Sequence, residues 1–142
     1  AAEIVLHRSL PSLIDGTARL RPQDLVRGSY FGGRTPEDGR LPPGAPAKQM
    51  HNLIRAVAPP YPGAFFDVAG RRLIVERTLF AAASAHVETR ATFALEARGD
   101  ELWITAADGG QLQVLSLRVD GELFDARRFV DTFGPEPLRP AE

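Results

Sequence analysis

Residues 64–80 read AFFDVAGRRLIVERTLF, two runs rich in aromatic and β-branched residues on either side of Ala69-Gly70. Such runs around a short separator are typical of a β-hairpin with a tight turn. Three further strands are predicted, over residues 92–97, 101–106 and 111–119. Five strands without long helices between them predict a mainly β domain, a small antiparallel barrel or sandwich.

The strand over residues 111–119 has an ambiguous pattern. Alternation groups Leu112 and Val114 with either Ser116 or Arg118, against a face that carries Leu115, Leu117 and Val119. Glycine turns bound the strand on both sides.

Helices are predicted before and after the strands in the sequence. One ends before Gly16, a second lies between Pro46 and Pro59, and a third lies between Asp125 and Gly134. The third helix has Asp125 as its N-cap and directs its aromatic residues inward.

The chain between the first two helices has no sustained periodicity and many turn-forming residues. An irregular segment of this length is typical of a linker that lies across another surface. The predicted organisation is therefore a helix over residues 1–16, a linker over 17–46, a domain over 47–135 and a loose tail over 136–142.

Composition excludes several classes of protein. The chain has no cysteine, so it has no disulfide scaffold, thiolate zinc site or cysteine nucleophile. It contains no apolar run near the roughly 20 residues of a membrane span and no secretory signal, so the cytoplasm is the expected location. Residues 61–142 carry 9 basic and 13 acidic side chains, a net charge of −4 that disfavours nucleic acid as a partner.

Three stretches carry a family resemblance: SYFGGRTPEDG at residues 29–39, HNLIRAV at 51–57 and PYPGAF at 60–65. They resemble the linker and the start of the C-terminal domain in formyltransferases that depend on 10-formyltetrahydrofolate. The resemblance implies an OB-like C-terminal barrel preceded by a Rossmann-like catalytic domain, whose last helix would be residues 1–16.

The resemblance also implies a substrate class. The first two stretches are most similar in sequence to enzymes that formylate a nucleotide-linked amino sugar, the UDP-4-amino-4-deoxy-L-arabinose formyltransferases of lipid A modification. The alternatives are a methionyl-tRNA formyltransferase, which shares the Pro-Gly-Ala turn, and an OB-like binding module without catalysis.

No catalytic residue is expected on this chain. In the family, an Asn, His and Asp set in the Rossmann-like domain performs the transfer, and that domain binds the 10-formyltetrahydrofolate. His7 lies in a stretch that echoes the catalytic histidine motif, but Val5 stands where the motif has Asn. The chain alone is therefore expected to be inactive, with the catalytic domain as its partner in cis or in trans.

Arg34 is the main candidate for binding substrate. In a glycine-rich linker its guanidinium can fork onto a phosphate or a carboxylate, and by resemblance this linker borders the nucleotide-sugar site. The alternative is a salt bridge between domains through Glu37 or Asp38. Tyr30 and Phe31 either stack on a base or fasten the linker.

Four other residues are expected to be structural. His51 and Arg55 lie on the second helix, where hydrogen bonding at a domain junction is predicted for His51 and a link to the linker for Arg55. Pro62 and Gly63 fit backbone geometry at the entry to the first strand. The histidines are scattered without paired spacing, His86 is expected in solvent, and no metal site is predicted.

One departure from the family pattern falls inside the linker. Where these sequences commonly continue Gly-Arg-Ile-Asp-Trp, this chain has Pro42 and Pro43 in place of Asp and Trp. Any contact that the family makes through that carboxylate or indole is absent here.

Overall fold

The computed structural model describes residues 2–30, 32–81 and 90–140. The chain divides into two compact units, residues 1–33 and residues 34–142. The first unit contains helix α1 (Ala2–Ile14) and a short 3-10 turn, η1 (Leu25–Arg27). The first predicted helix is thus confirmed, with Pro11 inside it.

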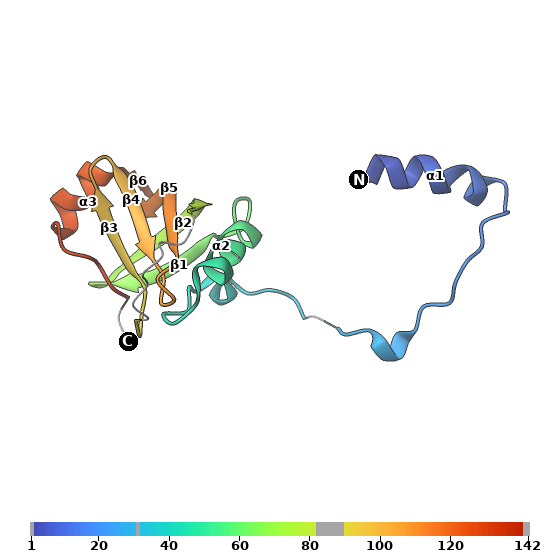
Figure 1. Ribbon diagram of the computed structural model, residues 1–142, viewed down its shortest axis with the longest axis horizontal. Helices are drawn as coiled ribbons and strands as arrows, with labels where there is room; N and C mark the ends of the chain where they lie inside the picture. The colour runs from blue at the N-terminus through green and yellow to red at the C-terminus, as the bar shows by residue number, and fades with distance from the viewer. Residues whose placement is uncertain (1, 31, 82–89, 141–142) are drawn as a thin grey trace. The chain divides into compact units, whose positions relative to one another are not determined.

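The second unit is mainly β. Its elements in chain order are η2 (Pro36–Gly39), α2 (Ala47–Ala56), β1 (Ala64–Val68), β2 (Arg71–Phe80), β3 (Ala94–Arg98), β4 (Glu101–Thr105), β5 (Gln111–Val119), β6 (Glu122–Phe124) and α3 (Ala126–Phe133). The strands form one antiparallel sheet in the order β1-β2-β5-β4-β3, with β6 beside β5 (Figure 1). This curled half-barrel confirms the predicted OB-like antiparallel fold.

The first hairpin has the predicted tight turn. Ala69 and Gly70 both adopt positive φ, at 50° and 73°. Positive φ at both central residues matches the right-handed twist of the flanking strands. The short strand β6 was not predicted, because three residues are too few to show alternation.

A paired irregularity in β2 and β5 explains the ambiguous pattern of the last long strand. The register shifts on both sides of the pair Arg77↔Ser116. In β5 the buried positions change from Leu112 and Val114 to Leu117 and Val119. Each strand thus changes which side chains face the core at the same point, as β-bulges do.

Two helices fill the half-barrel. Met50 and Ile54 of α2 and Phe129 of α3 are at most 1% exposed and belong to one hydrophobic core with the strands. Asp125 caps α3 as predicted, because its side chain accepts a hydrogen bond from the backbone N–H of Arg128. No helix in the described part of the chain is long and apolar enough to cross a membrane.

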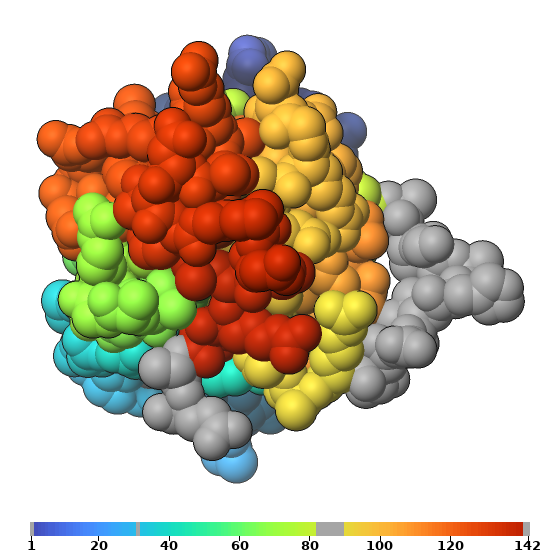
Figure 2. All heavy atoms as spheres, turned by 90° about the vertical axis from the view of Figure 1, so that its left-hand side faces the viewer, coloured from blue at the N-terminus to red at the C-terminus, as the bar shows by residue number. Residues whose placement is uncertain are grey.

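Segments outside the strands pair with both outer strands of the sheet. Beside β1, the N–H of Leu41 donates to the carbonyl of Phe65 at 2.7 Å. Beside β3, Leu138 and Leu95 exchange two backbone hydrogen bonds of 2.8 Å. Figure 2 shows the C-terminal segment, in red, next to the yellow β3 strand.

Residues 34–46, which fall within the predicted linker, therefore pack with the barrel. Leu41 is 1% exposed. The two prolines that depart from the family pattern form part of a turn, where the carbonyl of Pro42 accepts from Ala45 and that of Pro43 accepts from Phe93. Their missing N–H groups leave these contacts intact, since both prolines act as acceptors.

A substitution pair tests the core. Ile54→Val removes one buried methylene and should lower the free energy of unfolding by about 1 kcal/mol. The same change at Ile4, which is 57% exposed on α1, should leave it unchanged. Urea unfolding followed by the fluorescence of Trp103, the single tryptophan, reports on the second unit alone. Equal effects at both positions would contradict the assignment of Ile54 to the core.

Candidate functional site

A cavity of about 620 Å³ lies where η2, the end of α2 and the approach to β1 meet. Arg34, Asp38, Tyr61, Pro62 and Gly63 are among the residues that line it. Tyr61 is 64% exposed, so its ring is available at the surface. The cavity thus combines a cation and an aromatic ring at the start of the second unit.

The carboxylate of Asp38, which lines the same cavity as Arg34, forms hydrogen bonds within the η2 turn. Asp38 accepts hydrogen bonds from the backbone N–H of Thr35 at 2.6 Å and from its hydroxyl at 3.3 Å. This arrangement closes the turn from within, as a capping box does. Among the described residues, no ion pair includes Arg34.

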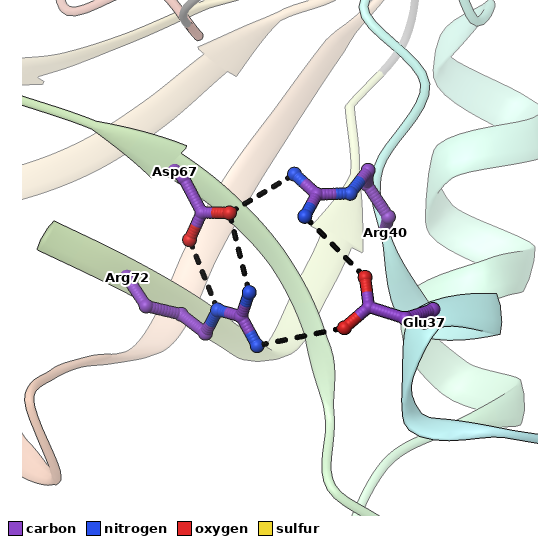
Figure 3. Close-up of polar contacts among 4 residues, drawn as sticks. All are labelled: Glu37, Arg40, Asp67 and Arg72. Carbon is purple, nitrogen blue, oxygen red and sulfur yellow. Dashed lines mark hydrogen bonds and ion pairs between the residues drawn. The ribbon is translucent and has the colours of Figure 1, made fainter. Parts of the chain in front are cut away.

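Glu37, Arg40, Asp67 and Arg72 join η2 to the first hairpin, and we call these four residues the linker clamp (Figure 3). Arg40 contacts Glu37 at 3.3 Å and Asp67 at 3.0 Å. Arg72 donates to both oxygens of Asp67, at 2.9 and 3.2 Å, and lies 4.0 Å from Glu37. Four alternating charges therefore close a ring across the two segments.

The clamp sits over the buried ring of Phe65. The guanidinium carbon of Arg72 lies 3.9 Å from the ring centroid and that of Arg40 lies 4.8 Å from it. Phe65 itself is 3% exposed. Each ion pair alone would contribute little at this exposure, but stacking on the aromatic ring adds a cation–π attraction to the network.

The clamp changes the acidity of its central carboxyl group. The hydrogen bond from Arg72 is the largest cause that lowers the pKa of Asp67, and Arg40 contributes in the same direction. The hydrogen bonding that Arg72 donates to Asp67 in turn raises the pKa of Arg72. Both groups thus stay charged over the neutral range.

Glycine is required on both sides of the cavity. Gly63 has φ of 92°, and a Cβ there would lie 2.5 Å from Cγ2 of Ile74. A Cβ on Gly39 would lie 2.6 Å from the carbonyl oxygen of Gly63. The backbones at residues 39 and 63 therefore approach closely only because Gly39 has no side chain, and the absence of a side chain at Gly63 leaves room for Ile74.

The structure brings some of the predicted site residues together and separates others. Arg34, Pro62 and Gly63 share the cavity. Tyr30 belongs to the first unit, where it is 95% exposed, and Phe31 and His86 lie outside the described residues. Tyr61 was not singled out from the sequence, although the stretch PYPGAF contains it.

The two helix residues with predicted structural roles face β2. A ring nitrogen of His51, Nδ1, lies 2.8 Å from the hydroxyl of Thr78 in β2. Arg55 lines a second cavity together with His51 and residues of β2. The described residues contain no group of three side chains that could hold a metal ion.

The depressed pKa of Asp67 makes stability depend on pH. Since the folded pKa lies below the unfolded value, the stabilising contribution is present above about pH 4 and is lost as the pH falls through the folded pKa. Asp67→Asn should therefore lose less free energy of unfolding between pH 6 and pH 2.5 than the wild-type chain. Urea unfolding at a series of pH values measures this difference, with Asp100→Asn, in the β3–β4 turn, as the control. Parallel curves for wild type and Asp67→Asn would contradict the clamp.

Comparison with models of protein families gives a match over residues 34–134 to the family described as formyl transferase, C-terminal domain. The match begins at Arg34, the residue at which the second compact unit begins. It confirms the formyltransferase family that the three stretches predicted, and it covers the linker clamp and the cavity.

Proposed function

The chain belongs to the formyl transferase C-terminal domain family, and we propose that it serves a formyltransferase whose acceptor is the amine of a nucleotide-linked amino sugar. The donor in this proposal is 10-formyltetrahydrofolate, bound by a Rossmann-like catalytic domain in cis or in trans. In that reaction the amine nitrogen would form a bond to the formyl carbon while the bond from that carbon to N10 of the folate breaks, and a base on the catalytic domain would pass the amine proton to N10 of the departing tetrahydrofolate. The present chain binds and orients the acceptor.

The observation that carries the proposal is that Arg34 and Tyr61 line the same cavity. Its guanidinium has no carboxylate partner among the described residues, so it is available to fork onto a diphosphate. The exposed ring of Tyr61 offers a flat surface for a base or a sugar. The linker clamp holds η2, which begins two residues after Arg34, against the first hairpin.

The charge of the second half favours a small acceptor over tRNA. Residues 61–142 carry a net charge of −4, whereas a surface that holds a nucleic-acid backbone needs excess lysine and arginine. A UDP-sugar needs few cations because it has one diphosphate. UDP-4-amino-4-deoxy-L-arabinose fits this description.

Helix α1 supports a catalytic domain as partner. Leu6, Leu10 and Ile14 follow one face of the helix at helical spacing and are 47–75% exposed. Together with Pro11 they line an apolar groove along the helix. In the proposal, this face packs against the catalytic domain as its last helix.

The proposal predicts that activity requires both parts. The 142-residue chain mixed with 10-formyltetrahydrofolate and UDP-4-amino-4-deoxy-L-arabinose should yield no product. With the catalytic domain joined to it or added in trans, mass spectrometry should detect an acceptor heavier by one formyl group in place of one amine hydrogen. Product from the chain alone, or from the complete enzyme with methionyl-tRNA but not with the UDP-sugar, would contradict the proposal.

Arg34 should matter for acceptor binding in that complete enzyme. Arg34→Gln should raise the KM for the UDP-sugar about tenfold or more, because it removes a charge-assisted contact. Arg34→Lys should recover only part of the loss, since it keeps the charge without the fork. The KM for 10-formyltetrahydrofolate should stay unchanged in both variants. Arg127→Gln on α3 is the matched control, and an equal KM in Arg34→Gln and wild type would remove Arg34 from the acceptor site.

A further inference from the structure

A second cavity, of about 390 Å³, lies between α2 and the bulged part of β2 and β5. His51 and Arg55 line it from α2, Arg77 and Leu79 line it from β2, and Leu115 lines it from β5. None of these residues lines the cavity of Arg34, so the two cavities are separate. The activity proposed above leaves the second cavity unused.

The electrostatic balance of this cavity is positive. Among the described residues, neither Arg55 nor Arg77 forms an ion pair. Glu76 is the carboxylate in the lining, but one of its oxygens accepts from Ser116 at 2.6 Å and the other from Arg118 at 2.8 Å. Arg118 thus balances the negative charge of Glu76. The positive charges of Arg55 and Arg77 have no such counter-charge in the cavity lining.

The neighbouring histidine adds a neutral polar group. Burial, with the charge of Arg55 as a second cause, lowers the pKa of His51. Its Nδ1 is engaged by the hydroxyl of Thr78, and Phe80 packs edge-on to the ring. The imidazole is therefore held in one orientation at the cavity wall. Its other ring nitrogen, Nε2, takes no part in the hydrogen bond with Thr78.

The bulge builds the opposite wall. The register shifts around the pair Arg77↔Ser116 leave Glu76 and Leu115 without a directly opposed partner. As a result Arg77 and Leu115 are exposed at the cavity, while Glu76 turns to Ser116 and Arg118. Bulges redirect side chains in this way and are frequent beside binding sites.

Apolar side chains complete the lining. Leu79 and Leu115 are 53% and 43% exposed beside the two arginines, and Ala58 adds a small apolar surface. A cavity with one cation on each wall and exposed apolar side chains beside them matches a ligand with an anionic head and an apolar body.

We propose that this cavity binds an organic phosphate monoester, with the phosphate held by Arg55 and Arg77 and the organic part lying against Leu79 and Leu115. A phosphate suits two guanidiniums from different elements, because its three terminal oxygens accept hydrogen bonds from separate directions. The second nitrogen of His51 contributes a third polar contact.

Titration of the 15N-labelled 142-residue chain with phenyl phosphate tests the site, with backbone amide NMR shifts as the readout. The shifts should saturate and concentrate in α2 and around residues 76–79 and 115. Arg55→Gln and Arg77→Gln should each weaken binding about tenfold or more. Arg127→Gln, which removes the same charge from α3, should bind as wild type does. The amide spectra of the variants also show whether they remain folded.

Inorganic phosphate, titrated alone, should bind more weakly than phenyl phosphate, because it makes no apolar contact. Equal affinities would overturn the assignment of an organic ligand. Shifts that never saturate, or an equal loss in Arg127→Gln, would show only screening by surface charge and would overturn the site. Loss of binding in Arg34→Gln, with Arg55→Gln and Arg77→Gln unaffected, would place the anion in the other cavity. This test requires no catalytic domain, so its failure leaves the formyltransferase proposal standing.

Discussion

The contact between two arginines and the buried ring of Phe65 determines how the start of the second unit sits on the sheet. Arg40 belongs to the segment before α2, and Arg72 belongs to β2, yet both lie over the same aromatic face. Asp67 and Glu37 then cross-link the two guanidiniums. Besides this stack, the segment is joined to the barrel by the backbone hydrogen bond of Leu41 and by the burial of its side chain.

The packing of Arg40 and Arg72 on Phe65 also shows how exposed ion pairs stabilise more when they form a network over an aromatic ring. Exposed ion pairs are each worth at most about 1 kcal/mol, and the four clamp residues are all partly exposed. Here they share partners, and the aromatic ring restricts where the guanidiniums can go. The four charges are thus paired among themselves beside the cavity, and Arg34 lies outside this ring of ion pairs.

Much of the fold was predictable because its signals are local. The hairpin over residues 64–80 and the cap of α3 by Asp125 depend on neighbours in the sequence, and both appear as predicted. The bulge at Arg77 could not be predicted, because a change of face in one strand becomes interpretable only beside the matching change in its partner. The alternation in residues 111–119 left open which side chains face the core, and the bulge that explains this ambiguity is visible only in the structure.

The residues of the candidate site also fall into two groups, those that sequence motifs identify and those that only the fold brings together. Arg34, Pro62 and Gly63 stood out because they lie in motifs, and the structure gathers them at one cavity. Asp67 and Arg72 had no such signal. They pair with each other across the first hairpin, but their other partners, Arg40 and Glu37, are about 30 positions away in the sequence and are found only through the fold. Arg55 lines the second cavity together with residues of β2, and this placement likewise depends on how α2 docks.

The two short pairings at the margins of the sheet bear on how this domain can be dissected. Strands at the margin of a sheet carry unpaired backbone groups that recruit strands from other molecules. Here Leu41 protects one margin and Leu138 the other, and both lie outside the run of strands. A fragment trimmed to residues 47–133 would therefore keep the core residues of the strands and of α2 and α3 but expose the backbone of both outer strands, and we expect it to self-associate.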